Sequence, residues 1–299
     1  MDTILCAVDF SPLTVQTVRM GARLAERCGA RLALFHAVAF PIDGIFGSDR
    51  PERDIKARRL TREARQRLAE LGDDTRMAHD IILASGDPVE ALQALVQARA
   101  VDLVVTASRG IGGMERLLVG TVVERMVVKV PRPVLMLRMG GAGSPPAGPL
   151  PFGRILVGCD LRHPEDPALD FARRLALCLG AELHLLHVIE APLDEDLDDS
   201  YEDFQRNLPQ RTARQLEAVC PDRRPGERIF TAVYPGMPAE ALRRCAREKG
   251  CDLIVVGVHR VGTLKGALIG TTARQLLHKA PCSLLTVPES FATARGRWQ

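Results

Sequence analysis

Two short loops in this 299-residue chain carry residue types that suit phosphate groups. The first loop opens with Ala107–Gly110, continues for nine residues and closes with Gly120–Thr121. The second opens with Gly257–Arg260, continues for nine residues and closes with Gly270–Thr271. Glycines let a backbone approach a phosphate closely, and a Gly-Thr pair that opens a helix presents free N–H groups to an anion. The pattern indicates two anion-binding loops, in which each closing threonine is placed to donate to a phosphate.

The loops belong to a long internal repeat. Asp102–Leu137 returns as Asp252–Val287, and earlier in the chain Gly29 aligns with Gly180. Self-similarity at a fixed offset indicates two copies of one folding unit. The sequence therefore predicts two tandem domains, a Gly/Pro-rich linker and a C-terminal tail, with the respective ranges 1–139, 153–289, 140–152 and 290–299.

Each half alternates short runs rich in Val, Ile and Leu with longer amphipathic stretches, a pattern typical of a parallel sheet covered by helices. The predicted strands are Thr3–Val8, Leu32–Val38, Ala78–Leu83, Leu103–Thr106, Val134–Leu137, Ile155–Cys159, Leu183–Ile189, Arg228–Val233, Leu253–Val256 and Ser283–Val287. The predicted helices after the first are Glu52–Leu71, Pro88–Ala98, Gly120–Val130, Asp166–Leu179, Tyr201–Val219, Pro238–Lys249 and Thr271–Lys279. In the first helix, Ser11 is expected to act as the cap and Pro12 to take the first helical position.

This element order predicts an α/β chain with two tandem, doubly wound, five-stranded parallel sheets of the Rossmann-like type. Ligands of such sheets bind beyond the carboxyl ends of the strands, where the strand order reverses. That rule places Asp9, Ala37 and the loop after Thr106 around one crevice. It places Asp160, Val188 and the loop after Val256 around a second.

Composition excludes several classes of partner. The net charge is +3 and neither half has the basic excess of a nucleic-acid binder. No apolar run is long enough for a membrane span, and the N-terminus lacks a signal-peptide pattern, so a cytoplasmic location is the default expectation. The eight cysteines form no CxxC pair, which favours reduced thiols over a zinc site.

The two loops, together with the strand ends at Asp9 and Asp160, resemble the universal stress protein family over both halves of the chain. In nucleotide-binding members of that family the loop reads G-x2-G-x9-G-[ST]. The first half matches this pattern at Gly110 and Gly120–Thr121 but has Ala107 at the first glycine. A methyl group is a small intrusion if the local φ is negative, so the first half is the better nucleotide candidate.

The second half matches the family pattern at Gly257 and Gly270–Thr271 but has Arg260 at the second glycine. The arginine could add charge to a phosphate, but its bulk favours a filled or repurposed crevice.

The resemblance implies that the chain binds an adenine nucleotide, ATP with or without Mg²⁺. It places Asp9 and Asp160 at the ribose or adenine, although charge complementarity at a helix start accounts for them equally well. It places Ala37 and Val188 against the base. The implied nucleotide-binding residues are Asp9, Ala37, Thr106, Ala107, Gly110, Gly120, Thr121, Val122, Asp160, Val188, Gly257, Arg260, Gly270 and Thr271.

The resemblance also implies an internal pseudo-dimer through edge strands 134–137 and 284–287, further homodimerisation, and signalling through protein partners that the sequence does not identify. No P-loop, GxSxG or HExxH motif is present, so no enzymatic activity is expected. Three alternatives stay open. They are a stress scaffold without a nucleotide, a binder of an apolar or metal ligand in the second half, and a slow ATPase.

Overall fold

The computed structural model of the chain describes residues 1–38, 50–109, 120–139, 152–161, 166–190, 199–220, 222–258, 260–261 and 268–291. These residues form two units, one of Met1–Arg109 with Val119–Leu137 and one that begins at Arg138. Gly110, the predicted linker up to residue 151 and the tail beyond residue 291 lie outside the described residues. The domain bounds and the pairing of the two halves stay predictions.

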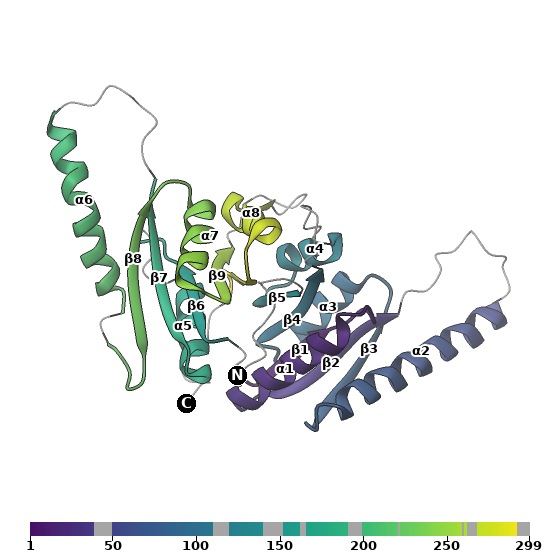
Figure 1. The fold of residues 1–299 in the computed structure, drawn as a ribbon. Coiled ribbons are helices and arrows are strands. Elements are labelled where there is room, and N and C mark those ends of the chain that lie inside the picture. The colour runs from purple at the N-terminus through teal and green to yellow at the C-terminus, as the bar shows by residue number, and fades with distance from the viewer. Residues whose placement is uncertain are drawn as a thin grey trace. The chain divides into compact units, whose positions relative to one another are not determined.

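The first unit is built on a sheet with the strand order β3-β2-β1-β4-β5 (Figure 1). The strands are β1 (Thr3–Ala7), β2 (Arg31–Val38), β3 (His79–Ser85), β4 (Leu103–Arg109) and β5 (Val134–Met139). The helices are α1 (Thr14–Cys28), α2 (Arg50–Asp73), α3 (Pro88–Ala98) and α4 (Thr121–Lys129). Helix α1 packs beside α2, and α3 packs beside α4, so the two pairs cover opposite faces of the sheet.

The second unit repeats this order as β8-β7-β6-β9-β12, with every neighbouring pair parallel. The strands are β6 (Arg154–Gly158), β7 (Glu182–Ile189), β8 (Arg228–Pro235), β9 (Leu253–Val258) and β12 (Ser283–Pro288). The helices are α5 (Pro167–Leu179), α6 (Asp199–Ala218), α7 (Pro238–Lys249) and α8 (Thr271–Lys279). A separate antiparallel pair, which the sequence did not predict, consists of β10 (Arg260–Val261) and β11 (Leu268–Ile269). The predicted doubly wound α/β fold is confirmed.

Burial explains why these segments form strands and helices. Every residue of β1 and of β12 is buried, because helices cover both faces of a doubly wound sheet. Helices α1 and α5 each end at a glycine with positive φ, Gly29 at 62° and Gly180 at 66°. A glycine adopts this left-handed conformation without a side-chain clash, and its N–H satisfies carbonyls of the last turn. The chain thereby turns directly into β2 or β7.

The predicted start of the first helix was wrong. Helix α1 begins at Thr14, after the cap residue Leu13, which makes no side-chain hydrogen bond to the helix. The side chain of Ser11 instead accepts a hydrogen bond from the N–H of Leu13 at 3.3 Å, and its carbonyl accepts one from Thr14 at 3.0 Å. The Ser-Pro signal therefore marks a turn that precedes the helix, because the serine hydroxyl bonds locally.

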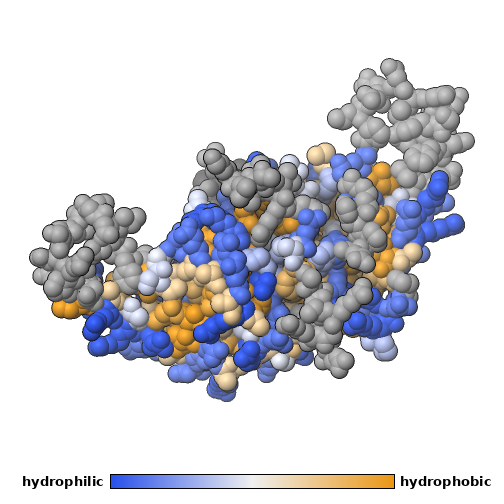
Figure 2. All heavy atoms as spheres, turned by 180° about the vertical axis from the view of Figure 1, so that it is seen from behind, coloured by the Kyte–Doolittle hydropathy of each residue, from blue (hydrophilic) through white to orange (hydrophobic). Residues whose placement is uncertain are grey.

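Hydrophilic residues dominate the face of the molecule seen in Figure 2, with an apolar patch over the first unit. The edge strand β3 belongs to this unit, and residues 81–84 of that strand are half-buried. Five large apolar side chains in the described ranges are exposed, namely Val15, Ile55, Val122, Phe230 and Met237. No helix in the same ranges is long and apolar enough to cross a membrane.

A close approach of α1 to β1 stabilises the first unit. Gly21 faces Cys6, which is completely buried, and a methyl group at Gly21 would overlap the Cys6 sulfur. Gly29 and Gly180, which end α1 and α5, are aligned in the repeat, and in this alignment Ala172 of the second unit corresponds to Gly21. The helix-to-strand spacing of the first unit therefore depends on the absence of a side chain at this position.

We expect Gly21→Ala to lower the free energy of unfolding by about 1–3 kcal/mol, because overpacking forces the helix away from the strand. Urea unfolding of the full chain measures this loss. Adding Cys6→Ala removes the overlapping sulfur, so the double variant should lose less stability than the sum of the two single variants. Additive losses would show that this contact is not the cause.

Candidate functional site

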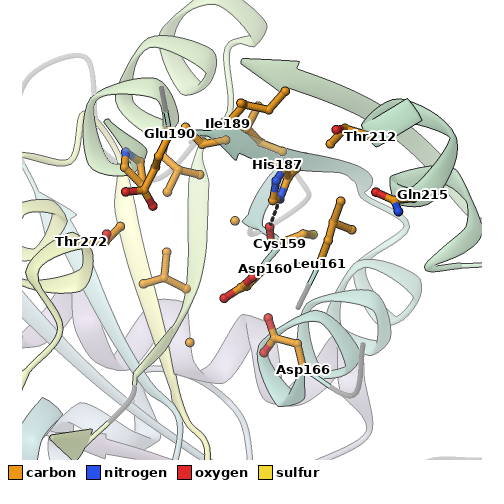
Figure 3. Close-up of a pocket in the computed structure, with 17 residues that line it drawn as sticks. Cys159, Asp160, Leu161, Asp166, His187, Ile189, Glu190, Thr212, Gln215 and Thr272 are labelled. Carbon is orange, nitrogen blue, oxygen red and sulfur yellow. Dashed lines mark hydrogen bonds between the residues drawn. The ribbon is translucent and has the colours of Figure 1, made fainter. Parts of the chain in front are cut away.

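A ligand-sized cavity of about 810 Å³ opens at the carboxyl ends of the second sheet (Figure 3). The strand order reverses between β6 and β9, and residues at the ends of β6 and β7 and within β9 line the cavity. Residues at the start of α5 and on α6, α7 and α8 complete the described wall. This is where a doubly wound sheet binds its ligand. The volume falls within the usual range for small-molecule sites.

Three of the predicted site residues of the second half, Asp160, Val188 and Gly257, meet in this cavity. The other three, Arg260, Gly270 and Thr271, are not among the residues that line it. Gly270 is the cap residue of α8 and Thr271 is its first residue, and their neighbour Thr272 lines the cavity. The backbone of Arg260 lies in β10, and its side chain is outside the described part of the structure.

The cavity also contains residues that the sequence did not predict as ligands. Asp166 caps α5, and Thr212 and Gln215 lie three residues apart on α6 (Figure 3). The Asp-Pro pair at the start of α5 was recognisable in the sequence as a helix start but not as part of a site. Thr212 and Gln215 carried no recognisable pattern, because only the folded sheet brings α6 beside the end of β7.

His187 is fixed in one orientation at the cavity wall. Its Nδ1 lies 2.9 Å from the carbonyl oxygen of Cys159, and a carbonyl can only accept a hydrogen bond. Nδ1 therefore carries the hydrogen, and Nε2 of the neutral ring is left as an acceptor. His36 makes the same bond in the first unit, to the carbonyl of Val8 at 2.8 Å. In both halves the imidazole ties the ends of two neighbouring strands together.

Cys159 beside His187 is not a nucleophile. Its side chain is buried, and burial raises the pKa of the thiol, with a further contribution from the negative charge of Asp166. A thiol with a raised pKa stays protonated at neutral pH and is unreactive.

The corresponding residues of the first unit also gather at a reversal of strand order, between β1 and β4. Asp9 follows β1, Ala37 lies near the end of β2, and Thr106 and Ala107 lie in the middle of β4. Parallel pairing of β1 with both neighbours brings these strand ends to one edge of the sheet. The pairing brings the predicted residues Asp9, Ala37, Thr106 and Ala107 to neighbouring strands at this edge, and their role as a binding site stays a prediction.

The backbone after Asp9 is strained. Phe10 has a φ of 58°, a left-handed value that costs a bulky residue about 1–3 kcal/mol. Its ring lies 4.3 Å from the ring of His36 between centroids, and the guanidinium of Arg67 lies 4.1 Å over it. The Asp9 carboxylate accepts a hydrogen bond from the N–H of Ser11 at 2.9 Å. These contacts hold the exposed Asp9 in one turn directly after β1.

The first-half loop tolerates its departure from the glycine pattern. Among the described residues other than glycine, positive φ values occur at Phe10 and Arg76, so Ala107 has an ordinary backbone conformation. In the second half, a methyl group at Gly257 would lie 3.6 Å from Asp166 Oδ1 and 3.9 Å from Ala168 Cβ, which are ordinary contacts. Neither position requires glycine for the fold itself.

The helix that closes the first loop, α4, is fixed to α3 by an ion pair. Asp87 caps α3 and accepts two hydrogen bonds from Arg125 of α4, at 2.8 and 2.9 Å. The bonds from Arg125, and then the N–H of Glu90, lower the pKa of Asp87 to about 2. The aligned positions of the second unit are Met237 and Gln275, so this tether belongs to the first unit.

No group of three or more His, Cys, Asp or Glu side chains that could hold a metal ion occurs within the described ranges.

Comparison with known proteins identifies the family to which this duplicated fold belongs. A sequence model described as the Universal stress protein family matches residues 1–138 and again 151–288. A universal stress protein of Thermus aquaticus is 34% identical over 137 residues, 46% of this chain and 98% of that protein. One from Mycolicibacterium smegmatis is 25% identical over 292 residues, 95% of this chain and 96% of that protein.

A solved structure agrees at the level of the fold. The crystal structure of a universal stress protein from Archaeoglobus fulgidus superposes with a TM-score of 0.67 at 17% sequence identity, covering 96% of this chain and 98% of that one. The chain belongs to the universal stress protein family and carries two copies of its domain in tandem. The predicted resemblance is confirmed.

The tether between α3 and α4 has a testable pH dependence. Because the pKa of Asp87 is lower in the folded state than its ordinary value of 3.8, the pair stabilises the fold above about pH 4, and that stabilisation is lost as the pH falls toward 2. Asp87→Asn keeps a good helix cap but loses the ion pair, so it should cost at most about 1 kcal/mol at pH 7, since the pair is partly exposed.

Urea midpoints of the natural chain and Asp87→Asn, measured between pH 7 and pH 3, test this expectation. The gap between them should shrink as the pH falls. Asp80→Asn is the control, because the Asp80 carboxylate is exposed and forms no ion pair with any described residue. A gap that does not change with pH would show that the ion pair does not stabilise α4.

Proposed function

We propose that this tandem universal stress protein binds an adenine nucleotide in its first crevice and transmits the bound state through protein contacts during a stress response. ATP is the proposed nucleotide, and Mg²⁺ would accompany its phosphates. One universal stress protein has been solved in complex with cAMP; it is 20% identical over 46% of this chain, with a TM-score of 0.32. The support for the present proposal comes from the residues of this chain.

The observation that carries the proposal is the start of α4. Gly120 has a φ of −65°, and a methyl group built on it would contact nothing within 4 Å. Neither backbone conformation nor packing against the described residues requires a glycine here. No described side chain caps the helix, and Thr121 is exposed. A glycine with open space before free N–H groups suits the approach of a phosphate.

Asp9 and the strand ends supply the other half of the proposed site. The carboxylate of Asp9 is held at the mouth of the crevice by the N–H of Ser11 and can accept hydrogen bonds from ribose hydroxyls. Ala37 and Thr106 lie on the two strands next to β1, where a base would lie against the sheet. The small side chain of Ala107 lets the ligand approach the backbone.

Binding rather than catalysis is the proposed activity. Cys159, the thiol beside an imidazole in the described crevices, is held protonated by burial. His187 and His36 each use Nδ1 to bond a strand carbonyl and not to orient a nucleophile. These contacts support a role in which the crevices hold a ligand and other proteins read its presence.

A stress scaffold without a nucleotide is the second candidate, and the apolar patch over the first unit favours it. Small molecules released by denaturing the mildly purified protein distinguish the two candidates. Recovery of ATP or ADP at about one per chain supports nucleotide binding. Recovery of none, with no calorimetric binding of ATP and Mg²⁺, leaves the scaffold.

We expect Gly120→Val to weaken ATP binding at least tenfold, because two methyl groups would occupy the space that a phosphate needs. The extended conformation of Gly120, with ψ at 142°, suits valine, so the loss of stability should stay near or below about 1 kcal/mol. Isothermal titration calorimetry of the full chain measures the change in affinity, and a thermal melt confirms folding.

Gly270→Val is the matched control, because Gly270 also has open space and precedes α8 in the second unit. It should leave ATP binding by the first crevice unchanged. Equal loss from both variants would point to a site that both loops share, and an unchanged affinity in Gly120→Val would contradict the proposed site.

A further inference from the structure

The outer face of helix α2 carries a stripe of arginines. Helix α2 packs on β2 and β3 and beside α1 (Figure 1), and its buried side includes Ala64 and Leu68. Arg58, Arg62 and Arg65 follow one another at spacings of four and three residues, so they share one side of the helix. All three are exposed. This arginine stripe therefore lies on the side of α2 that points away from the core.

The charges of the arginine stripe are not neutralised within the helix. No acidic residue lies three or four positions before or after Arg62 or Arg65. Neither arginine forms an ion pair or a hydrogen bond with any residue that the structure describes, whereas the nearby Arg59 pairs with Glu63 at 3.6 Å. Positive charges at these spacings repel one another and destabilise the helix. A negatively charged partner would remove this repulsion.

The second unit folds in the same way without the stripe. When α2 and α6 are aligned through their fully buried leucines, Leu68 and Leu216, the last two arginines of the stripe correspond to Gln210 and Ala213. Positive charge at these positions is therefore not required for a helix to cover this side of the sheet. The difference between two copies of one fold points to a role of the stripe outside folding.

An exposed apolar residue continues the stripe. Ile55 lies three residues before Arg58, a spacing that keeps both on the same side of the helix. It is 68% exposed, more than any other large apolar side chain in the described ranges. The outer face of α2 thus combines unpaired positive charge with an uncovered apolar side chain. An acidic segment that also contains apolar residues complements such a face.

The same chain contains a segment of this composition. Seven of the ten residues from Asp194 to Asp203 are Asp or Glu, and none is Lys, Arg or His. Leu197 lies in the middle of this acidic segment, and helix α6 begins within it, at Asp199. Residues 194–198 lie outside the described residues, and their charges follow from the sequence. The charges of the acidic segment are opposite in sign to those of the arginine stripe.

We propose that the outer face of α2 docks the acidic segment of a second copy of this chain. Each chain carries one such face and one such segment, so two chains related by a twofold axis can form two of these contacts at once. One exposed ion pair contributes little, and a stable contact needs several pairs that form together. Salt should weaken the contact, because it screens exposed charges. The contact does not depend on the proposed nucleotide site.

Sedimentation velocity of the full chain at several protein concentrations tests this proposal. We expect a dimer at low salt whose affinity falls at least tenfold in about 1 M salt, where the Debye length is about 3 Å. Arg62→Glu together with Arg65→Glu should weaken the dimer at least tenfold at low salt. A thermal melt should show no loss of stability, because both side chains are exposed and form no ion pair with described residues.

Arg211→Glu together with Arg214→Glu is the control for net charge. These two arginines are exposed, lie at the same spacing on α6 and give the same change in charge. The control should change the affinity of the dimer by less than twofold. If the control weakens the dimer as much as the variant of the stripe does, the effect comes from net charge alone and the proposal is wrong.

A mixing experiment tests whether the two surfaces meet. Replacing Asp194, Glu195 and Asp196 by lysine changes the net charge of the acidic segment from −7 to −1 and should also weaken the dimer at least tenfold. Chains with this change, mixed with chains that carry the altered stripe, should associate more strongly than either alone, because one natural face then meets one natural segment. A natural chain that stays monomeric at low salt, including one whose own acidic segment covers α2, would overturn the proposal. A dimer that neither set of changes weakens would overturn it as well.

Discussion

The parallel pairing of two central strands is the constraint on which each half of this protein depends. Strands β1 and β6 each pair on both sides, and crossover helices bury both faces of the resulting sheet. Because the strand order reverses between β1 and β4, and between β6 and β9, the helices that follow the two strands of each pair lie on opposite faces and leave the edge between them uncovered. The crevice is thus a consequence of the topology, and its chemistry depends on which side chains follow the strands.

The two halves show how one topology can support two kinds of crevice. Both keep an aspartate after the first strand and a histidine that bonds the carbonyl before that aspartate. Around this shared frame the side chains differ. Phe10 and Arg67 stack on each other in the first unit. Helices α2 and α6 can be aligned through their fully buried leucines, Leu68 and Leu216. In this alignment Leu161 and Gln215 of the second unit correspond to Phe10 and Arg67, and both of them line the cavity.

Much of the fold could be predicted from the sequence, because apolar runs and internal repetition report burial directly. The apolar runs of the strands and the Asp-Pro pairs Asp87–Pro88 and Asp166–Pro167 at helix starts each consist of consecutive residues. Such local patterns can be recognised without knowledge of the tertiary structure. The start of α1 could not be predicted in the same way. Ser11 and Pro12 have the residue types of a helix cap, but the hydroxyl bonds within a turn, and local chemistry alone does not decide between these two outcomes.

The site was less predictable than the fold because its residues come from distant segments. Asp160, Val188 and Gly257 lie at or just after the carboxyl ends of strands, where topology places ligand contacts, and the sequence predicted them. Thr212 and Gln215 lie within a long helix whose contact with β7 exists only after folding. Asp166 was recognised as the start of a helix, yet its closeness to Gly257 is a property of the tertiary structure.

The strained turn after Asp9 connects stability with the proposed nucleotide site of the first unit. A left-handed phenylalanine persists only where its surroundings compensate for the strain, and here an imidazole and a guanidinium both contact its ring. The imidazole is itself fixed by a strand carbonyl, so the strain is offset by groups that belong to the rigid sheet and to α2. The turn thereby keeps the Asp9 carboxylate at the crevice mouth in the absence of a ligand. A binding group held in this way loses little conformational freedom when the ligand arrives, and this preorganisation favours binding.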